Sequence, residues 1–179
     1  MRKKELVREN YRLNTLADKD RGTTTENRLV TDQNGVTGRA FVMGKYPAKH
    51  NACEAISLHN AKVLSGLPSK LSDAIDAMFR NKVVGGKGFF GVLPWRLGKV
   101  FEAEGLPYRR VKFDELSRDG IFVVSFWNKK PWKNGLHTVA AQTADGVTTL
   151  YNYAGMTKLG ADMKKRFIVG YEIRSGSPE

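Results

Sequence analysis

The chain is poor in the residues that crosslink proteins or bind metals. Its 179 residues include one cysteine, Cys53, and three histidines. A single cysteine cannot form an internal disulfide, so the composition does not indicate an oxidising compartment. Structural zinc sites usually have four Cys or His ligands, and the sequence contains no CxxC or HxxxH pair. We therefore expect neither a metal nor a cofactor, and we expect His59 on an exposed or partly buried helix face.

Long apolar runs are also missing. The basic residues at the N-terminus are not followed by an apolar segment, which argues against a signal peptide. No stretch approaches the roughly 20 apolar residues that a membrane helix needs. We therefore expect no membrane span and a cytoplasmic location. The length is typical of one domain that buries a sizeable core without covalent crosslinks.

Acidic residues are scarce relative to basic ones. The chain has 30 Lys and Arg against 18 Asp and Glu, a net charge of +12 and a pI near 9.9. This balance favours acidic partners such as nucleic acid. The basic residues are dispersed, however, and no helix-turn-helix, zinc-finger or aromatic RNA-binding pattern accompanies them. A basic nucleic-acid-binding protein is therefore an alternative and not the leading hypothesis.

The polarity of the chain changes near residue 44. Residues 1–44 are polar, and we expect a partly irregular N-terminal extension with a helix over 3–17 and a short strand over 39–44. Such a segment has few apolar residues to pack, so we expect it to be dispensable for the core. Residues 45–179 are expected to form the compact domain.

The compact part begins with helices and ends with strands. Apolar residues at helical spacing predict three helices, and alternating apolar segments then predict an antiparallel sheet, which is the α+β class. The segment "GGKGFFG" lacks the phosphate-loop and dinucleotide-binding patterns, so it is expected to be a loop, with a place in the wall of a substrate cleft left open. The predicted helices span 51–66, 69–81 and 93–105, and the predicted strands span 108–113, 121–127, a 137–153 hairpin and 166–173.

Cys53 has two competing interpretations. A free cysteine is often a small buried hydrophobic residue. Cys53 falls in the first turn of its predicted helix, however, where the dipole and the unpaired N–H groups favour an anion. That position lowers the pKa of a thiol and makes the reactive thiolate more available. Cys53 is therefore a candidate nucleophile.

His137 and Asn152 are candidate partners for Cys53. His137 starts an apolar strand, and a two-residue turn at Asp145 and Gly146 would pair Ala144 with Val147. That register places His137 and Asn152 on one sheet face as diagonal neighbours, about 7–8 Å apart. The Asn152 amide oxygen is then expected to orient the His137 ring. A nucleophile, a base and an orienting group are the parts that thiolate catalysis needs.

Three segments carry a resemblance to a known family. "NACEAISLHNAKVLSG", "GVLPWRLGKVFEAEGLPY" and "GLHTVAAQTADGVTTLYNY" resemble the nucleophile helix, the helix before the sheet and the His-bearing hairpin of papain-like cysteine peptidases. The chain is most similar to their small bacterial branch, the bacteriocin-leader (double-glycine) peptidases, over residues 46–173. The resemblance implies that N-terminal helices, including the buried nucleophile helix, pack on a C-terminal antiparallel sheet. It also implies a Cys53–His137–Asn152 triad that acts on a peptide or protein substrate.

The chain departs from the family pattern at one position. Papain-like enzymes usually have a glutamine about six residues before the cysteine to help bind the oxyanion, and Pro47 stands there. Asn51 and His50 are the candidates for that role. Trp132, in a basic aromatic segment before His137, is a candidate substrate contact.

The leading hypothesis is a cysteine hydrolase, either a peptidase or an amidase, that works through a thioester. Two alternatives share the same fold. One is a transglutaminase-like acyl transferase, which would use the same triad. The other is a catalytically silent papain-like domain that binds a peptide or protein, and the missing glutamine favours it.

Overall fold

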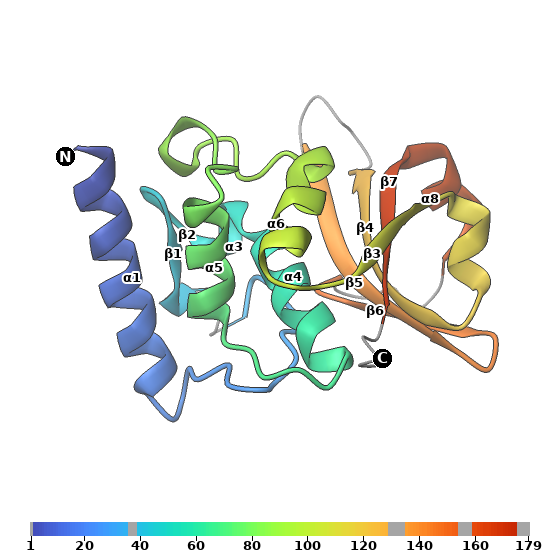
Figure 1. The fold of residues 1–179 in the computed structure, drawn as a ribbon, viewed down its shortest axis with the longest axis horizontal. Helices are drawn as coiled ribbons and strands as arrows, with labels where there is room; N and C mark the ends of the chain where they lie inside the picture. The colour runs from blue at the N-terminus through green and yellow to red at the C-terminus, as the bar shows by residue number, and fades with distance from the viewer. Residues whose placement is uncertain (1, 36–38, 129–134, 154–158, 175–179) are drawn as a thin grey trace.

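The computed structural model describes residues 2–35, 39–128, 135–153 and 159–174. Helices occupy the N-terminal half and an antiparallel sheet occupies the C-terminal half, which confirms the predicted α+β class (Figure 1). Within the described ranges, no helix combines the length and the apolar character needed to cross a bilayer. The helices are α1 (Lys3–Lys19), α3 (Ala48–Asn51), α4 (Cys53–Leu64), α5 (Leu71–Arg80), α6 (Leu97–Ala103) and α8 (Ala161–Arg166), with 3-10 turns η1 (Gly86–Gly88), η2 (Pro94–Arg96) and η3 (Phe113–Ser117).

Five strands form the main sheet in the order β3-β7-β4-β5-β6. A two-stranded β1–β2 ribbon precedes α3. In the β5–β6 hairpin, Ala144 pairs with Val147, which confirms the predicted register. Asp145 and Gly146 both have positive φ, at 52° and 74°, as the predicted two-residue turn requires. The strands are β1 (Val42–Met43), β2 (Tyr46–Pro47), β3 (Tyr108–Val111), β4 (Gly120–Trp127), β5 (Leu136–Ala144), β6 (Val147–Tyr151) and β7 (Phe167–Ile173).

The sheet separates two apolar cores. Alternation along β4 sends Val123 into the larger core with α4, α5 and α6, and sends Val124 to the opposite face with η3 and α8. Every residue of α4 from Cys53 to Ala61 is buried, because the helix is enclosed by α5, β4 and β5. The start of α4 is therefore held in the centre of the molecule.

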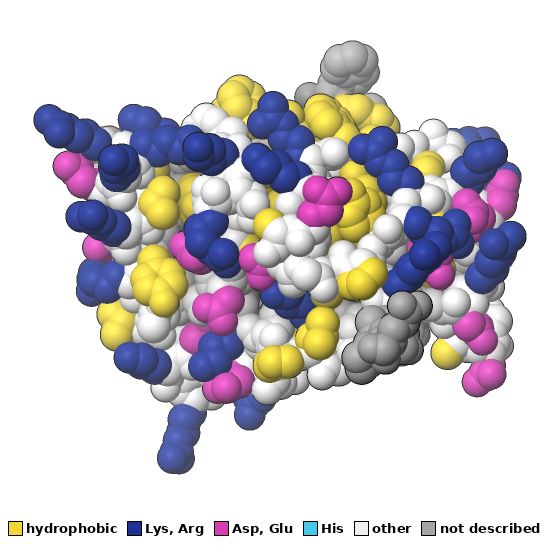
Figure 2. All heavy atoms as spheres, in the orientation of Figure 1, with side chains coloured by type: hydrophobic (Ala, Val, Ile, Leu, Met, Phe, Trp, Pro, Cys, Tyr) yellow, Lys and Arg dark blue, Asp and Glu magenta, His cyan; other side chains and the backbone are white. Residues whose placement is uncertain are grey.

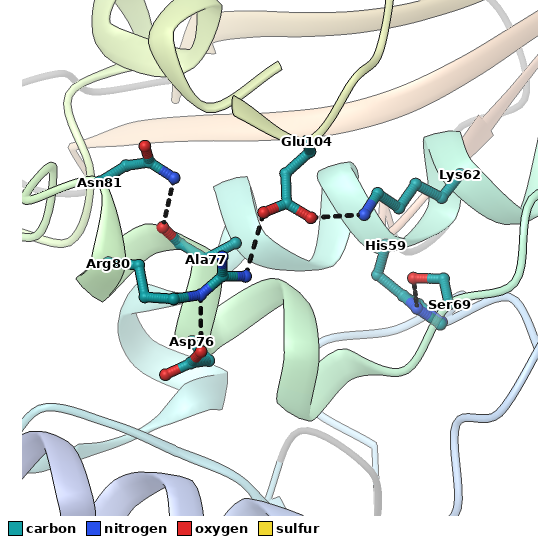
Figure 3. Close-up of polar contacts among 8 residues, drawn as sticks. All are labelled: His59, Lys62, Ser69, Asp76, Ala77, Arg80, Asn81 and Glu104. Carbon is teal, nitrogen blue, oxygen red and sulfur yellow. Dashed lines mark hydrogen bonds and ion pairs between the residues drawn. The ribbon is translucent and has the colours of Figure 1, made fainter. Parts of the chain in front are cut away.

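A polar network joins the helices of the larger core (Figure 3). Glu104, just after α6, accepts hydrogen bonds from Lys62 of α4 at 2.6 Å and from Arg80 of α5 at 3.1 Å. His59 is fully buried, which corrects the expectation of a partly exposed face. Its Nε2–H donates to the carbonyl of Arg28 at 2.7 Å, and its Nδ1 accepts from Ser69 at 2.9 Å. His59 therefore has a structural role.

The N-terminal segment belongs to the core, contrary to the division expected at residue 44. Phe41 and Met43 are fully buried in the larger core. The side-chain amide of Asn10 makes two hydrogen bonds to the backbone of Gly44, and that of Asn14 makes two to the backbone of Val42. These bonds hold α1 against β1 and the turn that follows it. Removal of residues 1–44 is therefore expected to destroy cooperative folding.

Asp18 provides a direct test of this packing. Its carboxylate accepts hydrogen bonds from the N–H and hydroxyl of Thr25 and from the N–H of Ser72 at the start of α5. Asp18→Ala leaves two buried N–H groups without a partner, so we expect a loss of about 2–4 kcal/mol in the free energy of unfolding, measured in urea. Glu9→Ala removes only an exposed ion pair with Arg12 and should cost less than about 1 kcal/mol. Equal small losses would show that α1 adds little to the core.

Candidate active site

Cys53 lies at the meeting point of two cavities. It is the first residue of α4 and is only 7% exposed. One cavity has a volume of about 470 Å³ and the other about 320 Å³. Both are lined by His50, Cys53 and Leu136, so Cys53 lies where the two cavities adjoin.

His137 lines the smaller cavity together with Cys53. Its Nε2 lies 2.7 Å from the backbone carbonyl oxygen of Asn152. A carbonyl can only accept, so Nε2 carries the hydrogen and Nδ1 is the basic nitrogen of the neutral ring. The ring packs against Phe126 and Tyr153, with centroids 5.8 and 5.6 Å away, and those two rings also contact each other. Burial lowers the pKa of His137, which favours the neutral imidazole.

Asn152 reaches His137 in a different way from the one expected. The contact comes from its backbone carbonyl and not from its amide oxygen. Strand β6 ends at Tyr151, and Asn152 has a φ of 69°, so its side chain leaves the alternation of the hairpin. Its Nδ2 donates to Gln33 at 3.0 Å instead. Within the described residues, the Asn152 Oδ1 is buried without a hydrogen-bond partner.

Gln33 is a site residue that the sequence did not reveal. Its Nε2 donates to the carbonyls of Ala48 and Lys49 at 3.3 and 2.8 Å, which fixes its Oε1 as the acceptor for Asn152. The backbone N–H of Asn152 also donates to the carbonyl of Thr31 at 3.1 Å. The segment 30–34 therefore holds Asn152, and through it His137, against the start of α3. No local pattern marks this role, because the contacts join distant parts of the chain.

Glu54 is the second site residue that sequence reasoning missed. Its side chain is 2% exposed, and its Oε2 accepts a hydrogen bond from the Cys53 thiol at 3.3 Å. Its Oε1 accepts from the hydroxyl of Thr138 at 3.0 Å, and that hydroxyl lies 2.9 Å from Ser125 Oγ. An acidic residue in the first turn of a helix usually faces solvent, so sequence alone gave no reason to bury it.

Burial controls the protonation of both Glu54 and Cys53. Removal from water raises the pKa of Glu54 to about 7, although the N–H groups of Glu54 and Val92 and the Thr138 hydroxyl oppose the rise. Burial, followed by the charge of Glu54, raises the pKa of Cys53 well above its ordinary value. This corrects the expectation that the helix start would lower it. The resting site therefore holds a neutral thiol and a neutral imidazole that line the same cavity.

The remaining site candidates from the sequence are His50, Asn51 and Trp132. His50 is exposed and lines both cavities, so it is placed to contact a substrate. Asn51 is buried, and its Nδ2 donates to the carbonyls of Met43 and Gly88 at 2.8 and 2.6 Å. Those bonds remove Asn51 as an oxyanion donor and give it a role in holding the glycine-rich loop. Trp132 lies outside the described residues.

The two cavities differ in chemical character. The walls of the larger one include Phe89 and Phe90 from the glycine-rich loop, whose side chains are 64% and 70% exposed, together with Leu93. The smaller one is lined by polar groups that include Gln33 and His137. The loop expected as a possible cleft wall therefore does line a cavity, beside the candidate nucleophile.

Neither a metal-binding group among the described residues nor a similar known protein assigns a function to the site. Across the described ranges, no three His, Cys, Asp or Glu side chains are grouped so that they could hold a metal ion. No protein-family model, curated protein or solved structure matches the chain. The geometry around Cys53 is therefore the basis for a functional proposal.

The buried Glu54 predicts a pH-dependent stability. Its pKa is about 7 in the folded protein against an ordinary value of 4.5, so the folded state holds the proton more tightly. Its contribution to the unfolding free energy therefore falls as pH rises from about 4.5 to 7, by about 3 kcal/mol in total. Glu54→Gln removes this contribution, so the variant should gain stability relative to the wild type between pH 5 and 8 in urea titrations. Glu102→Gln, which changes an exposed carboxylate, should show the same pH dependence of the unfolding free energy as the wild type. If Glu54→Gln also kept that dependence, the raised pKa of Glu54 would be contradicted.

Proposed function

We propose that the protein is a papain-like cysteine hydrolase, a peptidase or amidase, with Cys53 as nucleophile and His137 as base. One observation carries the proposal: Cys53 and His137 line the same cavity, and the Asn152 carbonyl fixes the ring with Nδ1 as its basic nitrogen. Helix α4, which begins at Cys53, packs against β5, which carries His137. This packing also supports the proposal, because thiolate chemistry needs a base and an orienting group around the sulfur.

The reaction begins with the neutral pair. The Cys53 proton passes to Nδ1 of His137 as the sulfur attacks the substrate carbonyl carbon, and the imidazolium then protonates the departing amine as the C–N bond breaks. A thioester on Cys53 remains. His137 next takes a proton from water, the hydroxide attacks the thioester, and the carboxylic acid leaves as the sulfur recovers a proton. Asn152 stabilises the imidazolium through its carbonyl, which accepts the Nε2–H throughout.

The position of His137 also orients the substrate. The leaving amine must lie near its proton donor, and His137 lines the smaller, polar cavity. The acyl portion then occupies the larger cavity, whose apolar side chains include Phe89, Phe90 and Leu93. The proposal therefore favours peptides with an apolar side chain on the acyl side of the scissile bond.

A catalytically silent peptide-binding domain is the second candidate. The raised pKa of Cys53 favours it, because a protonated thiol is a poor nucleophile. A transglutaminase-like acyl transfer would share the first half of the proposed reaction, with an amine in place of water. Nucleic-acid binding has less support: Figure 2 shows Lys and Arg side chains spread over the visible face and not gathered into a single patch.

Variants of the reacting pair test the proposal. A panel of fluorogenic peptide amides with apolar, acidic or basic acyl-side residues gives kcat/KM. Cys53→Ala should abolish turnover, and His137→Ala should lower it by about 10²–10⁴ because the proton-transfer group is lost. The folded wild type should also be alkylated at Cys53 by iodoacetamide, at a rate that rises with pH because the resting thiol is protonated. Alkylation without turnover of any peptide would favour the silent domain, and alkylation only after unfolding would make Cys53 a core thiol.

Gln33 should affect the rate through Asn152 and His137. Gln33→Ala frees the Asn152 side chain, so the carbonyl that holds the His137 ring is less well fixed. We expect kcat to fall about tenfold with little change in KM, a smaller loss than for His137→Ala, because a positioning residue acts through another. Gln142→Ala on β5, whose side chain contacts Tyr151, is the matched control and should keep the wild-type kcat. A change in KM alone would assign Gln33 to substrate binding instead.

A further inference from the structure

Glu54 touches the candidate nucleophile but has no part in the triad proposed above. Its Oε2 accepts from the Cys53 thiol at 3.3 Å, and its Oε1 accepts from Thr138 at 3.0 Å. Glu54 follows Cys53 in the chain, and Thr138 follows His137. The Glu54–Thr138 bond therefore ties α4 to β5 immediately beside the nucleophile and the base.

A purely structural role does not account for the charge of Glu54. A neutral amide could accept a hydrogen bond from the Thr138 hydroxyl and hold α4 and β5 together equally well. A buried carboxylate instead costs several kcal/mol unless a cation compensates it. Among the described residues, none of the ion pairs involves Glu54. The acidic group therefore calls for a role that an amide could not fill, and its only titratable hydrogen-bond partner there is the Cys53 thiol.

We propose that Glu54 sets the protonation state of the nucleophile by sharing a titrating proton with Cys53. In the main form the carboxylate accepts the S–H hydrogen bond, and in the minor form the carboxyl O–H donates to the thiolate. The inference rests on the proposed role of Cys53 as nucleophile. Its consequence is that Glu54 keeps the thiol protonated until His137 draws the proton away during attack.

The groups that surround Glu54 are compatible with this sharing. From α4 it meets the Cys53 thiol, from β5 the Thr138 hydroxyl, and from the loop before η2 the N–H of Val92. The hydroxyl of Ser125 on β4 lies 2.9 Å from the Thr138 hydroxyl. His50 and Arg96 line the cavity that Glu54 also lines, and His137 precedes Thr138 on β5. The thiol is therefore the titratable group in direct contact, and His137 is the neighbour that an experiment must remove.

Two acids that share a proton titrate as a pair. The thiolate of Cys53 should form in two steps, one when the pair loses its first proton and one when it loses the second. When residue 54 is an amide, the charge that opposes the thiolate is gone and the amide N–H can donate to sulfur. The thiolate should then form in a single step at lower pH.

The ultraviolet absorbance of the thiolate measures this without a reagent that must reach the sulfur. Cys53 is the sole cysteine of the chain, so the signal is unambiguous after subtraction of a Cys53→Ser blank. The titration is carried out in a His137→Ala background, with Glu54 and with Glu54→Gln. We expect two steps with Glu54, one step with Glu54→Gln, and at least about tenfold more thiolate at pH 8 in the latter, which corresponds to one pKa unit.

Two further variants make the result decisive. Thr138→Val removes the hydroxyl that donates to Glu54 and keeps the backbone N–H of residue 138 that faces Cys53. The first step should therefore move to higher pH, and this variant decides the matter if Glu54→Gln does not fold. Glu102→Gln should leave the profile unchanged. Identical single-step profiles with and without the Glu54 carboxyl would overturn the inference. If the profiles differ but no peptide amide is hydrolysed, the proposed function fails while the role of Glu54 stands.

Discussion

The close contact between the start of α4 and strand β5 brings Cys53, Glu54 and the His137 strand together. The Glu54–Thr138 hydrogen bond joins residues 84 apart in the chain. Ala52 and Ala55, which flank Cys53 and Glu54 in the chain, are fully buried in the larger core. The same contact buries a thiol and a carboxyl together, so the electrostatics of the site follow from the packing of one helix end.

The N-terminal segment completes the site as well as the core. Asn60 of α4 bonds both the N–H and the carbonyl of Val30, which fixes the chain just before Gln33. Gln33 then holds Asn152 at the end of β6. A single stretch of irregular backbone therefore connects α4, which carries Cys53, with the hairpin that carries His137. Side-chain amides suit this role because each can donate to one backbone group and accept from another.

The features predicted from sequence are those with a local cause. The hairpin register follows from the two residues of its turn, and the helix that carries Cys53 follows from apolar spacing. Glu54 and Gln33 were not predicted, because their partners lie 84 and 119 residues away and no periodic pattern records such pairs. The pKa of Cys53 was expected to fall because only the helix dipole is visible in a sequence, whereas burial and the charge of Glu54 require the fold.

A neutral resting pair is compatible with catalysis in a buried cleft. Burial raises the pKa of the thiol and lowers that of the imidazole, so it opposes separate charges at Cys53 and at His137. An ion pair formed between them would be stabilised by mutual attraction, which grows stronger as substrate excludes water. Attack on a carbonyl also consumes the thiolate as it forms. In the proposed mechanism the proton transfer therefore accompanies attack and does not precede it, and the proposed role of Glu54 is to delay that transfer until the substrate is in place.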